Sequence, residues 1–242
     1  MVIKPGGALD KTARAGSSAL EALLDEGAFA PSAEQPDQAI PDIVIRRLPI
    51  YLRTLDALLD RGVTSINSEE LAEAIGVTAA QIRRDLSYFG KFGKQGKGYD
   101  VRLLNSEIHH ILRLDRPWNV ALVGYGNLGQ AIVHYGGFVP TTFNIAAIFD
   151  RNETVGQTVN GLTVHDSRDV TPVVRELGIK LGIIAVSEAS AQEIADRLMA
   201  GGVTAILNYA PIVIKAPADV MVREVDPIGA MQSMTYYIHE GE

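Results

Sequence analysis

Apolar residues in the N-terminal half of the chain recur with the period of a helix. Positions 48, 52, 55, 58 and 59 share one helical face, and Pro49 predicts that the continuous helix begins there. Residues 67–76 predict a second helix, with Ser68 as its N-cap and Gly76 at its end. A third helix is expected over residues 79–89. Helices joined by a tight turn in this way are typical of a helix-turn-helix.

The third helix is expected to be buried on one side only. Ile82, Leu86 and Phe89 form its apolar face. The residues that face away from that side, or lie at its flank, are Ala80, Arg83, Arg84 and Ser87. Small side chains allow close approach to DNA and arginine pairs bidentately with guanine, so this face suits a major groove. The alternative is an ordinary solvated surface helix.

Residues 88–99, YFGKFGKQGKGY, combine three lysines, four glycines and four aromatics without an acid. Directly after a recognition helix, this stretch predicts a wing whose lysines contact DNA phosphates and whose glycines turn close to the duplex. The residues expected to contact DNA here are Tyr88, Lys91, Lys94 and Lys97. A phosphate-binding loop is excluded because its Gly-Lys pairs lack a glycine at the required spacing. A flexible linker is the remaining alternative.

The pattern changes after residue 117 to a buried strand followed by glycines. Gly124, Gly126 and Gly129 form G-x-G-x-x-G, a helix is expected from about residue 127, and a second strand ends in Asp150. This order is the dinucleotide fingerprint, with the pyrophosphate at the helix N-terminus. Asp150 would bind the ribose hydroxyls and favour NAD over NADP, although Arg151 weakens that preference. The alternative is a Rossmann-like unit that binds another ligand, such as coenzyme A.

Strands and helices continue to alternate to the end of the chain. Strands are expected at 162–165, 181–186, 203–208 and 220–225, with helices between them and a closing helix at about 228–239. This alternation predicts an α/β fold with a doubly wound parallel sheet, preceded by the winged helix-turn-helix.

Composition restricts the function further. The 242 residues carry a formal net charge of -7, yet residues 81–99 hold five basic side chains against one acid, Asp85. A basic edge on an acidic chain indicates an anionic partner. The absence of cysteine excludes disulfides and thiolate metal sites, and we expect no metal. Neither a signal peptide nor an apolar run of roughly 18–20 residues is found, so we expect a cytoplasmic protein without membrane association.

Residues for catalysis are hard to find. A dehydrogenase needs a proton-handling group beside the nicotinamide and a substrate pocket. His109 and His110 fall on a connecting helix, and the adjacent His165 and Asp166 would point to opposite faces of a strand. Tyr135 more often packs than reacts at such a position. We expect a sensor rather than an enzyme, and a nicotinamide-dependent oxidoreductase with an appended basic domain is the alternative.

These motifs together resemble the Rex family of redox-sensing transcriptional repressors. The matching pieces are RLPIYLR at 47–53, QIRRDLSYFG at 81–90, GKGY at 96–99, GYGNLG at 124–129, FD at 149–150 and ILNYAP at 206–211. They cover roughly residues 41–240. The run at 81–90, joined to the wing, is more specific than the glycine motif. Residues 1–40 exceed the usual family length, and we expect them to be a disordered extension.

The resemblance implies a homodimer in three parts. Residues 41–116 would form the winged-helix DNA-binding domain and connecting helix, residues 117–226 the Rossmann NAD(H)-binding domain, and residues 227–242 a dimerisation helix that crosses to the partner. Such a repressor binds a palindromic operator in double-stranded DNA when NADH is scarce, and NADH releases it.

The resemblance also implies roles for individual residues. The NADH/NAD+ site would comprise Gly124, Tyr125, Gly126, Asn127, Leu128, Gly129, Tyr135, Asp150, Asn208, Ala210 and Pro211. Arg53, Tyr135 and Asp226 would couple the DNA-binding helices, the nicotinamide end of the site and the partner subunit.

Overall fold

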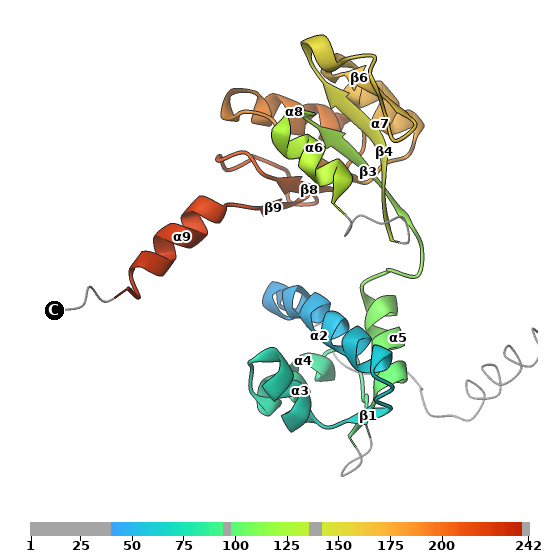
Figure 1. The fold of residues 1–242 in the computed structure, drawn as a ribbon, viewed down its shortest axis with the longest axis vertical. Helices are drawn as coiled ribbons and strands as arrows, with labels where there is room; N and C mark the ends of the chain where they lie inside the picture. Colours follow the sequence, from blue (N-terminus) through green and yellow to red (C-terminus); the bar gives the residue numbers. More distant parts are fainter. Residues whose placement is uncertain (1–39, 94–97, 136–141, 239–242) are drawn as a thin grey trace, which may run out of the picture. The chain divides into compact units, whose positions relative to one another are not determined.

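The fold is taken from a computed structural model that describes residues 40–93, 98–135 and 142–238 (Figure 1). The chain divides into two compact units, Met1–Leu112 and Arg113–Glu242, and each is described by itself. The extension expected over residues 1–40 falls outside the described residues except for Ile40. Lys94 and Lys97 of the expected wing also fall outside them.

The first unit is a helix-turn-helix closed by a short β-ladder. Its helices are α2 (Asp42–Asp60), α3 (Ser68–Ile75), α4 (Ala79–Ser87) and α5 (Val101–Ile111), and its strands are β1 (Ser65–Ile66) and β2 (Tyr99–Asp100). The strands pair antiparallel, with Ser65 opposite Asp100. This pairing returns the chain after α4 to the base of α3, which is the winged arrangement that the sequence predicts.

The start of α2 differs from the prediction. The helix begins at Asp42, and Pro49 lies inside it, so the predicted start at Pro49 is wrong. The added turns bury Val44 and Leu48. Burying two such side chains contributes about 3–6 kcal/mol, which offsets a cost of about 3 kcal/mol for proline inside a helix.

The cap of α3 is also shifted by one residue. Asn67, not Ser68, is the N-cap: its side chain accepts from the Glu70 amide at 2.8 Å, and the Glu70 carboxylate accepts from the Asn67 amide at 3.0 Å. Ser68 is buried, with its hydroxyl 3.4 Å from that of Tyr99. Gly76 ends the helix in the left-handed conformation, at φ 79°, which confirms the predicted stop.

The second unit is a seven-stranded doubly wound sheet in the order β5-β6-β4-β3-β7-β8-β9. Its strands are β3 (Trp118–Val123), β4 (Phe143–Asp150), β5 (Thr158–Val159), β6 (Leu162–Asp166), β7 (Leu181–Ile184), β8 (Ala205–Asn208) and β9 (Met221–Glu224). All pairings are parallel except β5 with β6. The predicted fold class is therefore confirmed, whereas β5 was not foreseen.

Alternate residues of the strands pack on the two faces of this sheet. One face packs on α7 (Val170–Glu176) and α8 (Glu188–Ala200) through Ala121, Val123 and Phe149. The other packs on α6 (Asn127–His134) through Val120 and Leu122. Short 3-10 turns, η2 (Asn152–Thr154) and η3 (Ser167–Asp169), follow β4 and β6.

The closing helix α9 (Pro227–Thr235) buries none of its residues. Ile228, Met231 and Met234 on it are all more than half exposed. Its predicted exchange between partners stays a prediction. Within the part of the chain that the structure describes, no helix is both long and apolar enough to cross a membrane.

Candidate nucleic-acid interface and dinucleotide site

The recognition helix α4 is buried on one side, as its sequence pattern predicts. Ile82 and Leu86 are buried, and Phe89, just beyond the helix, is partly buried. Its exposed residues include Ala80, Arg83, Arg84 and Ser87. Within the described residues nothing pairs with the Arg84 guanidinium. The exposed stripe can therefore reach a groove, and contact with DNA stays a prediction.

A buried carboxylate fixes α4 against α2. Asp85 has no exposed surface, and its oxygens accept from Arg47 Nε at 2.6 Å and Nη2 at 2.7 Å, from the Tyr51 hydroxyl at 2.6 Å and from Gln81 Nε2 at 2.7 Å. We call these four residues the Asp85 cluster. Because Gln81 is bound inside the cluster, its amide is directed away from the stripe of base-reading candidates.

The cluster keeps Asp85 charged although it is buried. Burial alone would raise the pKa of Asp85, but the hydrogen bonds from Arg47, Tyr51 and Gln81 hold it below its usual range. Burial raises the pKa of Tyr51 strongly, and its hydrogen bond to Asp85 adds to this shift. Tyr51 therefore stays a neutral donor, and Asp85 an ionised acceptor, at neutral pH.

The base of the wing is anchored by its aromatic residues. Phe92 and Tyr99 are buried, and Lys91 is exposed between the recognition helix and the wing. Gly98 has φ 73°, and a Cβ there would lie 2.6 Å from the carbonyl oxygen of Ile66. Only glycine fits this position, and anchored aromatics do not suit the flexible-linker alternative.

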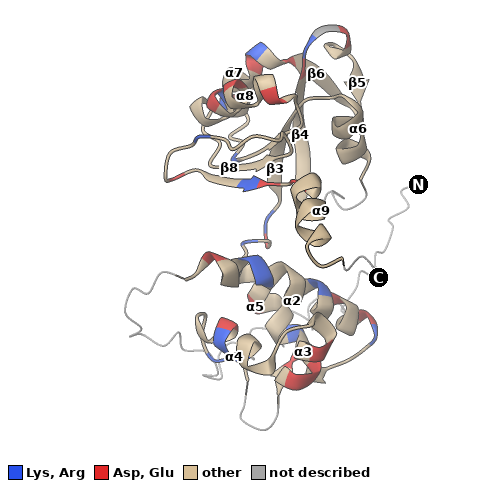
Figure 2. Cartoon of the chain, turned by 90° about the vertical axis from the view of Figure 1, so that its left-hand side faces the viewer, with Lys and Arg blue, Asp and Glu red and all other residues tan. Residues whose placement is uncertain are grey.

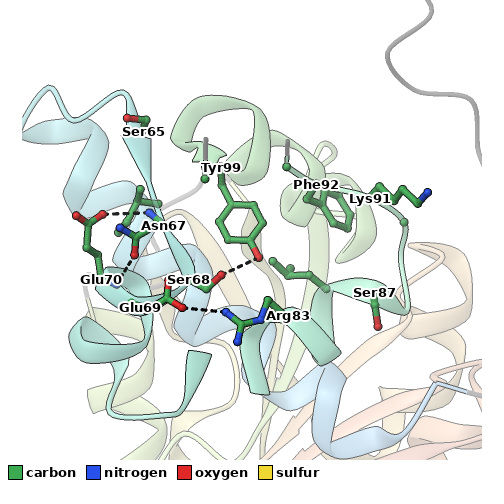
Figure 3. A pocket seen from close by; sticks show the side chains of 15 residues that line it. Ser65, Asn67, Ser68, Glu69, Glu70, Arg83, Ser87, Lys91, Phe92 and Tyr99 are labelled. Atoms are coloured by element: carbon green, nitrogen blue, oxygen red, sulfur yellow. Dashed lines mark hydrogen bonds and ion pairs between the residues drawn. The ribbon is translucent and has the colours of Figure 1, made fainter. Parts of the chain in front are cut away.

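A cavity of about 730 Å³ lies between α3, α4 and the base of the wing (Figure 3). It is lined by Glu69 and Glu70 of α3, Arg83 and Ser87 of α4, and Lys91, among others. Acidic residues on α3 and basic residues on α4 are marked in Figure 2. The cavity therefore brings opposite charges together at the face expected to meet DNA.

The glycine turn between β3 and α6 has the geometry that a dinucleotide requires. Gly124 has φ 103°, and a Cβ there would collide with the Ala185 backbone. A Cβ on Gly129 would collide with the Gly124 carbonyl oxygen, so this glycine permits close packing of helix on strand. Gly126 faces open space, which leaves room for a phosphate group at the turn.

The N-terminus of α6 is open to a ligand. Gly126 is its N-cap, without a side chain to bind the first amides, and Asn127 and Leu128 are exposed. Free amides and the helix dipole favour an anion here. The Tyr125 side chain instead packs on Ile148 and its neighbours, so its contribution to this site is its backbone.

Asp150 lies at the carboxyl end of β4, next to the glycine turn, as predicted. Its Oδ1 accepts from the Arg151 amide at 2.8 Å and its Oδ2 from the Thr154 hydroxyl at 2.7 Å. The Arg151 side chain points to α8, where its Nη2 donates to the Ser190 hydroxyl. The carboxylate is thus aligned by its own loop. Arg151, which would weaken a preference for NAD over NADP, is engaged by Ser190 instead.

A second cavity, of about 650 Å³, adjoins this end of β4. It is lined by Arg151, Val155, Asp166, Ser167, Arg168, Glu193, Ile194 and Arg197. Arg168 donates to both Asp166 oxygens, at 3.0 and 2.6 Å, and holds the pKa of Asp166 down to about 2. The sequence did not predict this cavity, because its residues come from three separate segments of the chain. Only the position of Arg151 beside Asp150 pointed to it.

The turn after β8 is held by Asn208, which is fully buried. Its amide donates to the carbonyl oxygens of Ala210 and Ile212, and its oxygen accepts from the Ala210 amide. These bonds occupy the side chain, so a role for Asn208 in the cofactor site would be to shape the loop through Ala210 and Pro211.

The three residues expected to couple the domains lie on separate elements. Arg53 is exposed on α2, Asp226 caps α9 by accepting from the Gly229 amide at 2.9 Å, and Tyr135 is the exposed C-cap of α6. Tyr135 therefore lies at the opposite end of α6 from the glycine turn, about 12 Å away along the axis. Its roles in the cofactor site and in coupling stay predictions.

Two family models match the chain, one on each unit. "Putative DNA-binding protein N-terminus" matches residues 39–87, and "CoA binding domain" matches residues 115–212. A redox-sensing transcriptional repressor Rex from Roseiflexus sp. is 53% identical over 199 residues, which are 82% of this chain and 90% of the relative. The chain belongs to the Rex family of redox-sensing transcriptional repressors.

Other Rex relatives agree over the same length. The repressor of Streptomyces coelicolor is 42% identical over 83% of this chain and 78% of its own. The crystal structure of RSP with β-NAD+ and operator DNA is 40% identical, with a TM-score of 0.79 over 83% of this chain and 93% of that one. RSP with β-NADH is 39% identical, with a TM-score of 0.75 over 83% and 95%.

The likeness to Rex structures extends over both units, so it supports the winged helix and the Rossmann unit together. Within the described residues, no three acidic or histidine side chains gather as they would to bind a metal ion.

Proposed function

We propose that this Rex protein is a transcriptional repressor that binds a palindromic operator when NADH is low and releases it when NADH binds. One observation carries the proposal: the same chain holds an exposed arginine stripe on a helix-turn-helix and a dinucleotide-binding glycine turn with Asp150 at the end of the following strand. The RSP relative, solved with β-NAD+ and operator DNA and with β-NADH, supports both ligands. A repressor of this kind acts on chromosomal DNA, and hence in the cytoplasm.

The residues of the second unit fit NAD(H) as the cofactor. Open space at Gly126 and the uncapped amides of α6 suit the pyrophosphate. The aligned carboxylate of Asp150 suits the two hydroxyls of a ribose and would repel a 2′-phosphate. Val155 and Ile194, which line the cavity beside it, offer apolar contact to an adenine ring.

NADH and NAD+ differ in the charge and shape of the nicotinamide ring, and the cofactor supplies that signal. A ligand shifts an equilibrium only through different affinities for two states. NADH must therefore favour a dimer whose two recognition helices no longer match half-sites about one helical turn apart. Arg53, Tyr135 and Asp226 are the residues proposed to connect these states.

The dimer is proposed from two apolar surfaces of the second unit. A groove of about 410 Å³ runs over Val120, Leu181, Ile183 and Leu207, on the sheet face that α6 covers only in part. The helix α9 exposes its own apolar residues. We propose that a second copy covers these surfaces, and sedimentation should show a dimer; a monomer at micromolar concentration would contradict this.

Like its Rex relatives, the chain is a transcriptional repressor and not an enzyme. The His165 ring packs on Phe149, with centroids 5.5 Å apart, and its neighbour Asp166 is bound to Arg168. This arrangement leaves the pair without the geometry of a proton relay.

Absorbance spectroscopy tests this reading against the two alternatives. In the presence of small carbonyl compounds the protein should bind NADH without oxidising it, so the NADH absorbance should not fall. Coenzyme A should not displace the bound NADH. Turnover of NADH would restore the oxidoreductase alternative. Displacement by coenzyme A would favour the ligand for which the second family model is named.

A further inference from the structure

An ion pair links the first turn of α3 to the recognition helix. Arg83 Nη1 donates to Glu69 Oε1 at 3.0 Å across the cavity beside the wing (Figure 3). Both side chains are exposed, Glu69 to 69% and Arg83 to 53%. Neither side chain fills the core, so any role of this ion pair is at the surface of the unit.

Glu69 lies outside the capping box of its helix. Glu70 already completes the capping box with Asn67, and Glu69 instead points to α4. A backbone hydrogen bond and then Arg83 hold the pKa of Glu69 below its usual value. An ionised carboxylate therefore stands among the groups expected to meet the phosphates of DNA.

The contact also leaves a defined part of Arg83 available. Guanidinium carries five donors in a rigid fork. With Nη1 engaged by Glu69, the edge formed by Nε and Nη2 remains, and a bidentate contact to guanine needs two such donors. A carboxylate in this place also repels a phosphate that would otherwise take the arginine.

We infer that Glu69 is a specificity-determining residue of operator binding: it orients Arg83 toward a base edge and keeps it from pairing with the phosphate backbone. This inference rests on the proposed function. Phosphate contacts add affinity without sequence information, whereas base contacts discriminate. An acid that withholds one arginine from phosphates therefore lowers binding to non-operator DNA, where that arginine has no base contact to make, and raises the preference for the operator.

The chain offers a matched control on the same helix. Glu73 is also exposed on α3, and within the described residues it has no hydrogen-bonding or ionic partner. Glu69→Gln and Glu73→Gln remove the same charge, but only the first removes the ionic partner of Arg83. Comparing the two separates the contact with Arg83 from the general effect of charge on DNA affinity.

The experiment measures anisotropy of the full-length dimer on operator and scrambled duplexes over a salt series. For Glu69→Gln we expect scrambled DNA to bind about 2- to 5-fold more tightly, with a salt slope steeper by about one unit. The ratio of operator to scrambled affinity should fall by the same factor. Glu73→Gln should leave the ratio unchanged, and in an Arg83→Ala background Glu69→Gln should no longer alter it.

The two possible failures are distinguishable. Wild type that does not prefer its operator, or that NADH does not release, contradicts the proposed function itself. Wild type that passes both tests, with Glu69→Gln and Glu73→Gln giving equal ratios and slopes, overturns the role of Glu69. Glu69 and Glu73 lie in the first unit, so wild-type circular dichroism and an unchanged urea unfolding midpoint in both variants confirm that this unit remains folded.

Discussion

Asp150 is aligned by two short hydrogen bonds within its own loop, one on each carboxylate oxygen. Replacing it with alanine should weaken NADH binding by about 10- to 100-fold, since hydrogen bonds to a charged group contribute about 1.5–3 kcal/mol. Operator binding without nucleotide should stay within twofold of wild type, because Asp150 lies in the other unit. Calorimetry measures the first quantity and anisotropy the second.

Thr154→Val is the control for Asp150, because it removes one aligning hydrogen bond and keeps the charge. It should weaken NADH binding less than Asp150→Ala does. Unchanged NADH affinity in Asp150→Ala would show that Asp150 is not the ribose ligand.

Asp85 makes the stability of the first unit depend on pH. Because its folded pKa is lowered, its contribution is present above its unfolded pKa of about 3.9 and is lost as pH falls through the folded value. Asp85→Asn breaks a buried pair with Arg47 and should cost about 3–5 kcal/mol at neutral pH. The variant should also lose part of the acid dependence, which urea unfolding between about pH 2 and about pH 7, monitored by circular dichroism, would measure.

Tyr51→Phe removes one hydrogen bond from Asp85 and leaves its ion pair intact. It should cost only about 1 kcal/mol and retain the acid dependence. Equal stabilities of Asp85→Asn and wild type at neutral pH would contradict the role of the Asp85 cluster.

At the scale of residues, sequence reasoning succeeded where the chemistry is local. The three glycines and Asp150 lie in consecutive elements, and their backbone requirements are visible in the spacing. The Asp85 cluster was missed because Arg47 and Asp85 are 38 residues apart, and nothing in the helical pattern distinguishes a buried aspartate from an exposed one.

At the scale of elements, the wing depends on the two-residue strands at its base. Gly98 must approach the carbonyl of Ile66, so Gly98→Ala should displace the ladder between β1 and β2. We expect weaker binding to operator and scrambled DNA alike and a flatter salt slope, since the wing lysines are proposed to contact phosphates. Anisotropy over a salt series measures both.

Gly62→Ala is the matched control for Gly98→Ala. Gly62 also has a positive φ, 74°, but a Cβ there meets nothing within 4 Å. It should lower stability without changing the salt slope. Equal slopes for Gly98→Ala and wild type would contradict a phosphate-binding wing that depends on this ladder.

Element type was easier to predict than element ends. Asn67 and Ser68 are both good caps, and only the backbone conformation decides between them. Proline usually marks a helix start, and at Pro49 tertiary burial overrode that preference. The strands β1, β2 and β5 have two residues each, too short for alternation to show.

At the scale of the whole molecule, the repressor needs a dimer that links two ligands. Exposed apolar residues on α9 and on the open part of the sheet are costly in an isolated subunit. Sequence patterns within one chain predicted the closing helix but carry no signal for what covers it. The resemblance to Rex supplied that expectation.

The most direct test is a titration of the operator complex with NADH and with NAD+ at fixed salt, using a palindromic duplex selected from random DNA. Fluorescence anisotropy should show release by NADH and retention with NAD+. By linkage, saturating operator should weaken NADH binding by the same factor by which NADH weakens operator binding. Tight DNA binding that ignores both nucleotides, or no DNA binding at moderate salt, would contradict a repressor controlled by NADH.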